Sequence, residues 1–201
     1  MTSCFVLGNG PSLADVKNET LDTLPTFGSN RIFMKYTTPS YYCCINPTEA
    51  NKYPKEIEEL ECIEKFVTNK VSIPGCTPLR STVSVQFSVS PRWAVQEGYS
   101  VTFVLLQLAY FFGFRTVYLL GVDHRYIQPP APNALITWRG EDVNHFDPNY
   151  VKDGDKWNCA DLQKSEMFFA IARDVYEMNG RRIINCTEDS ALDVFERGHI
   201  D

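Results

Sequence analysis

The sequence predicts an α/β fold, a Rossmann-like open and mostly parallel sheet with helices on both faces. Short apolar runs such as 4–7, 116–120 and 182–185 alternate with helical segments along the chain. This alternation is typical of parallel sheets, whose strands are buried on both faces and joined by helices. A length of 201 residues fits one α/β domain spanning 1–201. The segment at about 127–158 is rich in Pro, Asn, Asp and Gly, and we expect a lid-like loop there.

Further strands are expected where short apolar runs end at turn-forming residues. These runs cover 26–29, 41–45 and 63–68. The acidic stretch 48–61 predicts one exposed helix between the last two of these strands. From 71 to 98 prolines and glycines interrupt the pattern, so we expect only short strands or loop in that part of the chain.

Three later segments predict helices. Residues 100–112 are apolar almost all round, which predicts a central buried helix that ends at Gly113. Residues 160–179 show an amphipathic pattern that ends at Gly180. Residues 191–197 predict a short terminal helix.

Charge and hydropathy argue against two classes of protein. The net charge is −6, whereas binding to a nucleic-acid backbone requires a basic face. The longest apolar run, 101–114, is interrupted by Gln107 and is too short to span a bilayer. We therefore expect neither a nucleic-acid partner nor a transmembrane segment.

The cysteines and the first residues indicate the compartment. The seven cysteines are odd in number and include no Cys-x-x-Cys pair, which favours free thiols over a disulfide framework or a zinc site. The first residues enter an apolar strand without a basic region, so we read no signal peptide. These observations predict a cytoplasmic protein, and they leave a homo-oligomer open.

The clearest motif is the turn Gly8-Asn9-Gly10-Pro11-Ser12, which follows the first strand. Pro11 suits the first turn of a helix, and backbone N–H groups at such a turn can face a phosphate. The turn lacks the third glycine of the dinucleotide fingerprint and the Gly-Lys-Ser/Thr ending of a P-loop. NAD and an ordinary nucleoside triphosphatase site are therefore disfavoured, and a plain tight turn is the alternative.

Polar residues follow several predicted strands. Asn9, Asn30 and Asn46 come after the first three strands, and Asp123 follows the strand 116–120. In open α/β sheets ligands bind at the carboxyl ends of the strands, near the point where the strand order reverses. An Asn side chain both donates and accepts, which suits a base, a ribose or a phosphate, although capping of nearby backbone is its common alternative use.

Two further segments contain candidate catalytic and phosphate-binding residues. In Asp123-His124-Arg125-Tyr126 the Asp can hold a divalent cation or cap the next turn, while Arg125 and Tyr126 can bind phosphate oxygens. His145 lies in the polar loop and is the best candidate for a general base, because it titrates near neutral pH. Solvation is the alternative for His145. Aromatic residues in the same loop can stack on a ligand or anchor the loop; they are Trp138, Tyr150 and Trp157.

Four segments of the chain carry a family resemblance. They are Val6-Leu7-Gly8-Asn9-Gly10-Pro11-Ser12-Leu13, Phe27-Gly28-Ser29-Asn30-Arg31, Ile45-Asn46-Pro47 and Val117-Tyr118-Leu119-Leu120-Gly121-Val122-Asp123. With these four segments in this order, the chain resembles the 6-hydroxymethylpterin diphosphokinase-like domain family. It also resembles the related bacterial family 42 sialyltransferases, which use CMP-sialic acid.

The sialyltransferase resemblance implies a CMP-sugar donor and no metal. Asn9, Asn30 and Asn46 would contact the donor nucleotide, and His145 would deprotonate the acceptor hydroxyl. Two tyrosines bind the leaving phosphate in that family; Tyr126 is a displaced counterpart of one, and Tyr150 is the candidate for the other. The Thr-Ser-Gly that opens the family's central helix is represented by Ser100 and Thr102.

The diphosphokinase resemblance implies a different donor. The turn with Gly8, Gly10 and Ser12 would then cradle the phosphates of ATP, and Asp123 would help bind magnesium.

Three functions therefore remain. The first is a glycosyltransferase that uses a CMP-sugar and a small-molecule or glycan acceptor. The second is a pyrophosphoryl transferase that uses ATP and magnesium. The third is a nucleotide-binding protein without transfer activity. We rank the first above the second, because no acidic cluster for a magnesium–triphosphate site stands out.

Overall fold

Eight parallel strands form the central sheet of the computed structural model, which describes residues 2–91, 93–129 and 131–200. The strands are β1 (Ser3–Leu7), β2 (Thr26–Ser29), β3 (Tyr41–Cys44), β4 (Glu64–Thr68), β5 (Thr77–Leu79), β8 (Thr116–Leu120), β11 (Arg182–Asn185) and β12 (Glu196–Arg197). Their order is β12-β11-β8-β1-β2-β3-β4-β5, and every neighbouring pair is parallel. The predicted open α/β sheet is confirmed.

The strand order reverses between β1 and β8. The chain proceeds outward from β1 through β2, β3, β4 and β5, and then returns to place β8 on the other side of β1. β1 and β8 are in register from Ser3↔Thr116 to Leu7↔Leu120, so that both strands end at the same level. This pair of strand ends is the topological switch point at which open α/β sheets bind ligands.

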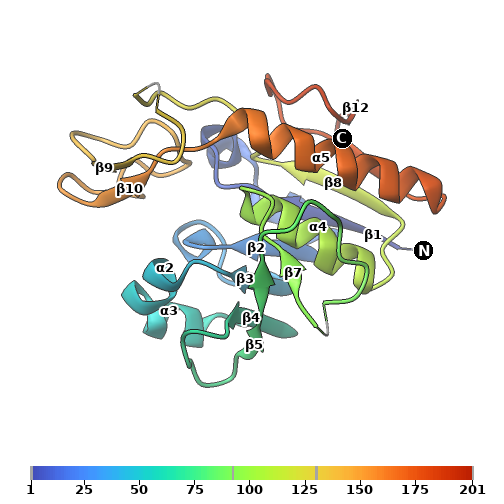
Figure 1. The fold of residues 1–201 in the computed structure, drawn as a ribbon, viewed down its shortest axis with the longest axis horizontal. Helices are drawn as coiled ribbons and strands as arrows, with labels where there is room; N and C mark the ends of the chain where they lie inside the picture. Colours follow the sequence, from blue (N-terminus) through green and yellow to red (C-terminus); the bar gives the residue numbers. More distant parts are fainter. Residues whose placement is uncertain (1, 92, 130, 201) are drawn as a thin grey trace.

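Each face of the sheet has its own apolar core. Cys4 and Val6 of β1 belong to one core, and the alternate residues Phe5 and Leu7 belong to the other. The first core contains the buried residues of α4 (Val101–Phe111) and α5 (Leu162–Met178). The second is covered by the 3-10 helix η1 (Pro11–Asp15) and by the short helices α1 (Asn18–Leu21), α2 (Pro47–Lys52) and α3 (Pro54–Glu59). Helices thus cover both faces, as predicted (Figure 1).

The central helix α4 is buried on nearly all sides. Ser100 is its N-cap, and Gly113 follows its end with φ +86°. Gln107 is the one fully buried polar residue of the helix: its side chain binds the backbone of Ser88, Gln96 and Phe103. Gln107 thereby fixes the segment that carries the small parallel pair β6 (Ser81–Thr82) and β7 (Val95–Gln96).

The loop predicted as a lid is packed against the molecule. It contains the antiparallel pair β9 (Leu135–Thr137) and β10 (Lys156–Asn158), which lies near the start of α5 in Figure 1. Phe146 and Val151 belong to the second core. Lys52 of α2 forms an ion pair with Asp155 at 2.7 Å, which joins this loop to the helices below it.

The helix predicted over 48–61 is in fact two helices, α2 and α3. Pro54 lacks the N–H that a continuous helix needs and disfavours helical backbone at the preceding residue. Tyr53 accordingly has φ −129° and ψ 47°. The helix expected after Gly10 is likewise short, a 3-10 helix of five residues.

The prediction of a helix over 191–197 is wrong. The side chain of Asn185 donates to the hydroxyl of Ser190 at 3.0 Å and to the backbone carbonyl of Leu192 at 3.1 Å. These bonds hold the segment beside β11, where Leu192 and Phe195 are buried and β12 extends the sheet. Tertiary contacts therefore override the local helical pattern.

No helix among residues 2–91, 93–129 and 131–200 has the length and hydropathy required to cross a membrane.

Candidate functional site

A cleft that is partly open to solvent lies at the switch point between β1 and β8. Its walls are the turn after β1, the start of α4, the segment after β8 and the start of α5. Its lining includes these sequence-predicted site residues: Gly8, Asn9, Gly10, Ser100, Thr102, Asp123, Arg125 and Tyr126. The fold thus brings together residues that are more than a hundred positions apart in the sequence.

The glycines of the first turn are required by close packing against the end of β8. The amides of Gly8 and Gly10 donate to the carbonyls of Leu120 and Gly121 at 2.8 and 2.9 Å. A Cβ on Gly8 would lie 2.2 Å from the oxygen of Gly121, and one on Gly10 would lie 2.0 Å from Oδ2 of Asp123. These two amides are therefore engaged within the protein rather than facing a phosphate.

Asp123 joins the two turns that meet at the cleft. Its carboxylate accepts from the backbone amide of Ser12 at 3.1 Å and from the Ser12 hydroxyl at 2.9 Å. Burial raises the pKa of Asp123, while the bonds from Ser12 and the charge of Arg125 oppose that rise. Ser12 does not line the cleft itself and acts through Asp123.

Groups suited to an anion surround the rest of the cleft. Ser100 caps α4 by accepting from the amide of Thr102 at 3.3 Å, so the positive end of that helix dipole faces the cleft. Arg125 is exposed. Burial, followed by the charges of Asp123 and Asp142, raises the pKa of Tyr126 to about 12. Tyr126 therefore keeps its proton at neutral pH and can donate it in a hydrogen bond.

His124 lines the same cleft, and the sequence reasoning did not assign it a role. Its backbone is left-handed with φ 56°, a conformation that is uncommon for a residue with a side chain. Nε2 lies 3.0 Å from Oε1 of Glu166 in α5. Burial lowers the pKa of His124, against the opposing effect of Glu166. In the sequence, the position of His124 between Asp123 and Arg125 is the one feature that points to it.

Three polar atoms at the ends of β1 and β2 are buried without a hydrogen-bond partner in the described part of the chain, and of their residues only Asn9 lines the cleft. They are Oδ1 of Asn9, Oδ1 of Asn30 and Nη1 of Arg31. Asn9 also donates through Nδ2 to Ser29 at 3.2 Å, which places the amide between the ends of β1 and β2. Buried polar atoms without partners are rare in native proteins, and a water, an ion or a ligand can satisfy them.

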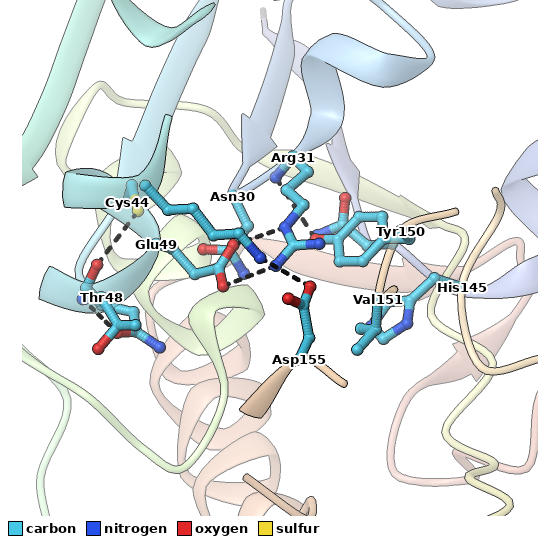
Figure 2. A network of polar contacts seen from close by, with 12 residues as sticks. Asn30, Arg31, Cys44, Thr48, Glu49, His145, Tyr150, Val151 and Asp155 are labelled. Carbon is cyan, nitrogen blue, oxygen red and sulfur yellow. Dashed lines mark hydrogen bonds and ion pairs between the residues drawn. The ribbon is translucent and has the colours of Figure 1, made fainter. Parts of the chain in front are cut away.

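Arg31 is buried in a network that Figure 2 shows from close by. It binds Glu49 with two hydrogen bonds of 2.7 and 2.9 Å, and its guanidinium lies 4.8 Å from the ring centre of Tyr53 and 5.1 Å from that of Tyr150. Asn30, the preceding residue, has φ 50° and accepts through its carbonyl from the hydroxyl of Tyr42 at 2.7 Å. In the sequence, Arg31 is noted only as the last residue of the segment Phe27-Gly28-Ser29-Asn30-Arg31.

His145 is buried, in contrast to the solvated position that a polar loop suggests. Its Nδ1 lies 2.7 Å from Oδ2 of Asp142. Its ring stacks on Tyr150 with centroids 4.0 Å apart and meets Trp157 edge-on at 4.9 Å. His145 does not line the cleft, but its ring lies 6.2 Å from that of Tyr126, which does.

Asn46 lies outside the cleft lining and has a local role. Its side chain accepts from the amide of Thr48 at 2.9 Å and so caps α2. Asn46 is exposed and is not part of the cleft wall. The prediction that it belongs with Asn9 and Asn30 is corrected to local capping.

The aromatic residues of the loop anchor it. Trp138 and Tyr150 are 8% and 2% exposed and belong to the second core. The indole nitrogens of Trp138 and Trp157 are also buried without a partner in the described residues. Trp138 belongs to the second core, Trp157 packs against that core, and the ring of Trp157 meets that of His145 edge-on.

The described residues include no group of three or more His, Cys, Asp or Glu that could hold a metal ion. Magnesium at phosphate sites is commonly held by one or two carboxylates together with the phosphates. Asp123 is the cleft carboxylate that fits such a role. The seven cysteines are free.

Comparisons with protein-family models, curated proteins and solved structures gave no match to this chain.

Proposed function

We propose that the protein is a nucleotide-dependent transferase that binds the phosphate of its donor in the cleft between β1 and β8. The observation that carries this proposal is the cleft lining, in which the start of α4, Arg125 and the protonated Tyr126 face one space. A helix N-terminus, a guanidinium and a hydroxyl are the groups that proteins use for phosphate. The one carboxylate of the segment after β8, Asp123, is already occupied by Ser12.

The unpartnered polar atoms at the ends of β1 and β2 support a nucleoside as the remainder of the donor. Oδ1 of Asn9 and Oδ1 of Asn30 are acceptors, and Nη1 of Arg31 is a donor. A nucleobase that carries an amino group and a carbonyl, such as cytosine, offers the complementary set. Burying such atoms without a partner costs about 1–3 kcal/mol each, so a ligand that pairs with them gains that free energy.

The favoured reaction is sugar transfer from a CMP-sugar, as the resemblance in the sequence implies. In this reaction the acceptor hydroxyl must reach Nε2 of His145, which lies beyond the cleft lining; Asp142 engages Nδ1 and leaves Nε2 to accept the proton. The acceptor oxygen then bonds to the anomeric carbon of the sugar while the bond from that carbon to the phosphate oxygen breaks. The released phosphate is stabilised by Arg125, Tyr126 and the start of α4. This reaction requires no metal.

Asp123 supports a second candidate function, pyrophosphoryl transfer. A magnesium ion held by Asp123 and by the phosphates of ATP would serve a pyrophosphoryl transfer of the diphosphokinase type. This alternative requires that magnesium displace Ser12 from at least one carboxylate oxygen. A nucleotide-binding protein without transfer activity is the third candidate.

A donor-cleavage assay separates these functions. We expect release of CMP from a CMP-sugar in the presence of EDTA, and faster release when a glycan acceptor is added. The variant His145→Gln should lose transfer but retain CMP binding, because His145 lies outside the cleft wall. Conversion of ATP that needs magnesium would support the second candidate, and nucleotide binding without any turnover would support the third.

A further inference from the structure

One titratable pair in the cleft has no role in the proposed transfer, His124 with Glu166. The ring of His124 lines the cleft and its side chain is 6% exposed, while Glu166 is about half exposed on α5. Glu166 engages Nε2 at 3.0 Å. Among the described residues no hydrogen bond engages Nδ1, so this nitrogen is the one left for a ligand.

The groups around His124 oppose one another in charge. α5 contributes Glu166 and the ring of Phe169, whose centre lies 6.1 Å from the imidazole. The segment after β8 contributes Asp123 and Arg125. The other cleft residues with polar side chains are amides, hydroxyls and phenols; they are Asn9, Tyr99, Ser100, Thr102, Tyr126, Asn144 and Ser165.

We propose that His124 takes up a proton when a phosphate-bearing donor binds, so that the imidazolium lies between the donor phosphate at Nδ1 and Glu166 at Nε2. This inference rests on the proposed donor site and adds a residue that couples its occupancy to pH. The proton comes from the solvent, and no covalent bond to the donor changes.

The physical reason is a change in the charge around one buried ring. Without the donor, burial favours the neutral form and lowers the pKa of His124. A phosphate brings negative charge into a partly buried cleft, where it favours the protonated form. Glu166 is already in place on the other nitrogen, so protonation completes a pair of charge-assisted hydrogen bonds.

The left-handed backbone of His124 supports a functional role for the position. Residues with side chains adopt this conformation at a cost, and such residues cluster at ligand sites. Asn tolerates the conformation best among residues with a side chain, so His124→Asn removes the titrating group with the least change in backbone.

Calorimetry measures the proposed proton directly. A CMP-sugar is titrated into the protein near pH 7 without acceptor, in two buffers of different ionisation enthalpy. Its phosphodiester does not titrate near neutral pH, so the proton uptake belongs to the protein. We expect net uptake approaching one proton per donor bound, and an affinity that weakens by up to about tenfold per pH unit as the pH rises.

Three variants assign the proton. His124→Asn should bind the donor with almost no proton uptake, and Glu166→Gln should show reduced uptake because it keeps a hydrogen-bond partner but loses the charge. His199→Asn, which changes an exposed histidine outside the cleft wall, should match the wild type. Donor binding without uptake, or uptake that survives in His124→Asn, would overturn the inference alone. A complete lack of donor binding at every pH would overturn the proposed function together with it.

Discussion

The carboxylate of Asp123 accepts both the backbone amide and the hydroxyl of Ser12, which lies 111 residues earlier in the sequence. This pair joins the turn after β1 to the turn after β8, at the point where the strand order reverses. The cleft between these turns therefore depends on contacts that no local segment provides by itself. Four predictions follow from this arrangement and from the buried polar groups around it.

Replacing Asp123 should loosen the cleft. Asp123→Ala leaves the amide and the hydroxyl of Ser12 without their acceptor, and we expect the free energy of unfolding to fall by about 1–3 kcal/mol. Asp123→Asn retains Oδ1 as an acceptor and should cost less. Urea denaturation measures the free energy of unfolding of both variants, and Asp193→Ala, at an exposed position, is the control. A loss in Asp123→Ala no larger than that in Asp193→Ala would contradict the structural role of the bond.

Gly10 should tolerate no side chain. A Cβ there would lie 2.0 Å from Oδ2 of Asp123 and 2.9 Å from the oxygen of Gly121. Gly10→Ala should therefore displace Asp123 and reduce stability by about 1–3 kcal/mol, the usual cost of overpacking. Gly140→Ala is the control, because its Cβ would meet no atom and its φ of +80° alone determines its cost. Equal nucleotide affinity in Gly10→Ala and wild type would argue against a ligand beside this turn.

Gln107 should be essential for the segment over α4. Replacing it with Leu leaves the amides of Ser88 and Gln96 and the carbonyl of Gln96 without their buried partner. At about 1–3 kcal/mol for each unsatisfied group, we expect a loss of about 3 kcal/mol or more. Hydrogen exchange at the two amides should accelerate. The same change at the exposed Gln163 should leave both stability and exchange unaltered.

His124 should make the free protein less stable in mild acid. Burial holds the pKa of His124 below its ordinary value of 6.5, so the unfolded chain binds this proton more readily than the folded chain. The free energy of unfolding should therefore fall as the pH drops from 6.5 through the lower folded pKa, and should be unaffected by this group at higher pH. Denaturation curves of His124→Asn should show a smaller decline over that interval; an identical decline would contradict the assignment.

The sequence predicted the strands more accurately than the helices around them. The runs at 26–29, 116–120 and 182–185 have the bounds of β2, β8 and β11, because the central residues of each run are buried in the sheet or nearly so. The helix predicted over 191–197 does not form. The side chain of Asn185 binds the backbone carbonyl of Leu192, and pairing of β12 with β11 takes the place of the helix. Hydrogen bonds between residues of different elements, such as these, produce no recognisable pattern in the local sequence.

The candidate site was predictable where it follows strand ends. Asn9 and Asp123 lie at the ends of β1 and β8, and topology brings them to one cleft. Asn46 has the same sequence signal but caps α2, which shows that the signal alone does not distinguish a ligand site from a cap. The partners of His124 and His145 were not predictable, because Glu166 and Asp142 become neighbours only through packing.

The central claim is that the cleft between β1 and β8 binds a nucleotide, and thermal unfolding with CMP, CDP, UDP, ATP and GTP, each with magnesium or EDTA, tests it most directly. At one hundred times its Kd, CMP should raise the free energy of unfolding by about 2.7 kcal/mol, or roughly 5–11 °C in Tm for a chain of this size, in EDTA as well. The shift should diminish in Arg125→Gln, which lines the cleft, and persist in Arg139→Gln, which removes an exposed cation outside its lining. A shift with ATP that EDTA abolishes would move the assignment to the diphosphokinase alternative. No shift with any nucleotide, or an equal shift in Arg125→Gln, would contradict the account.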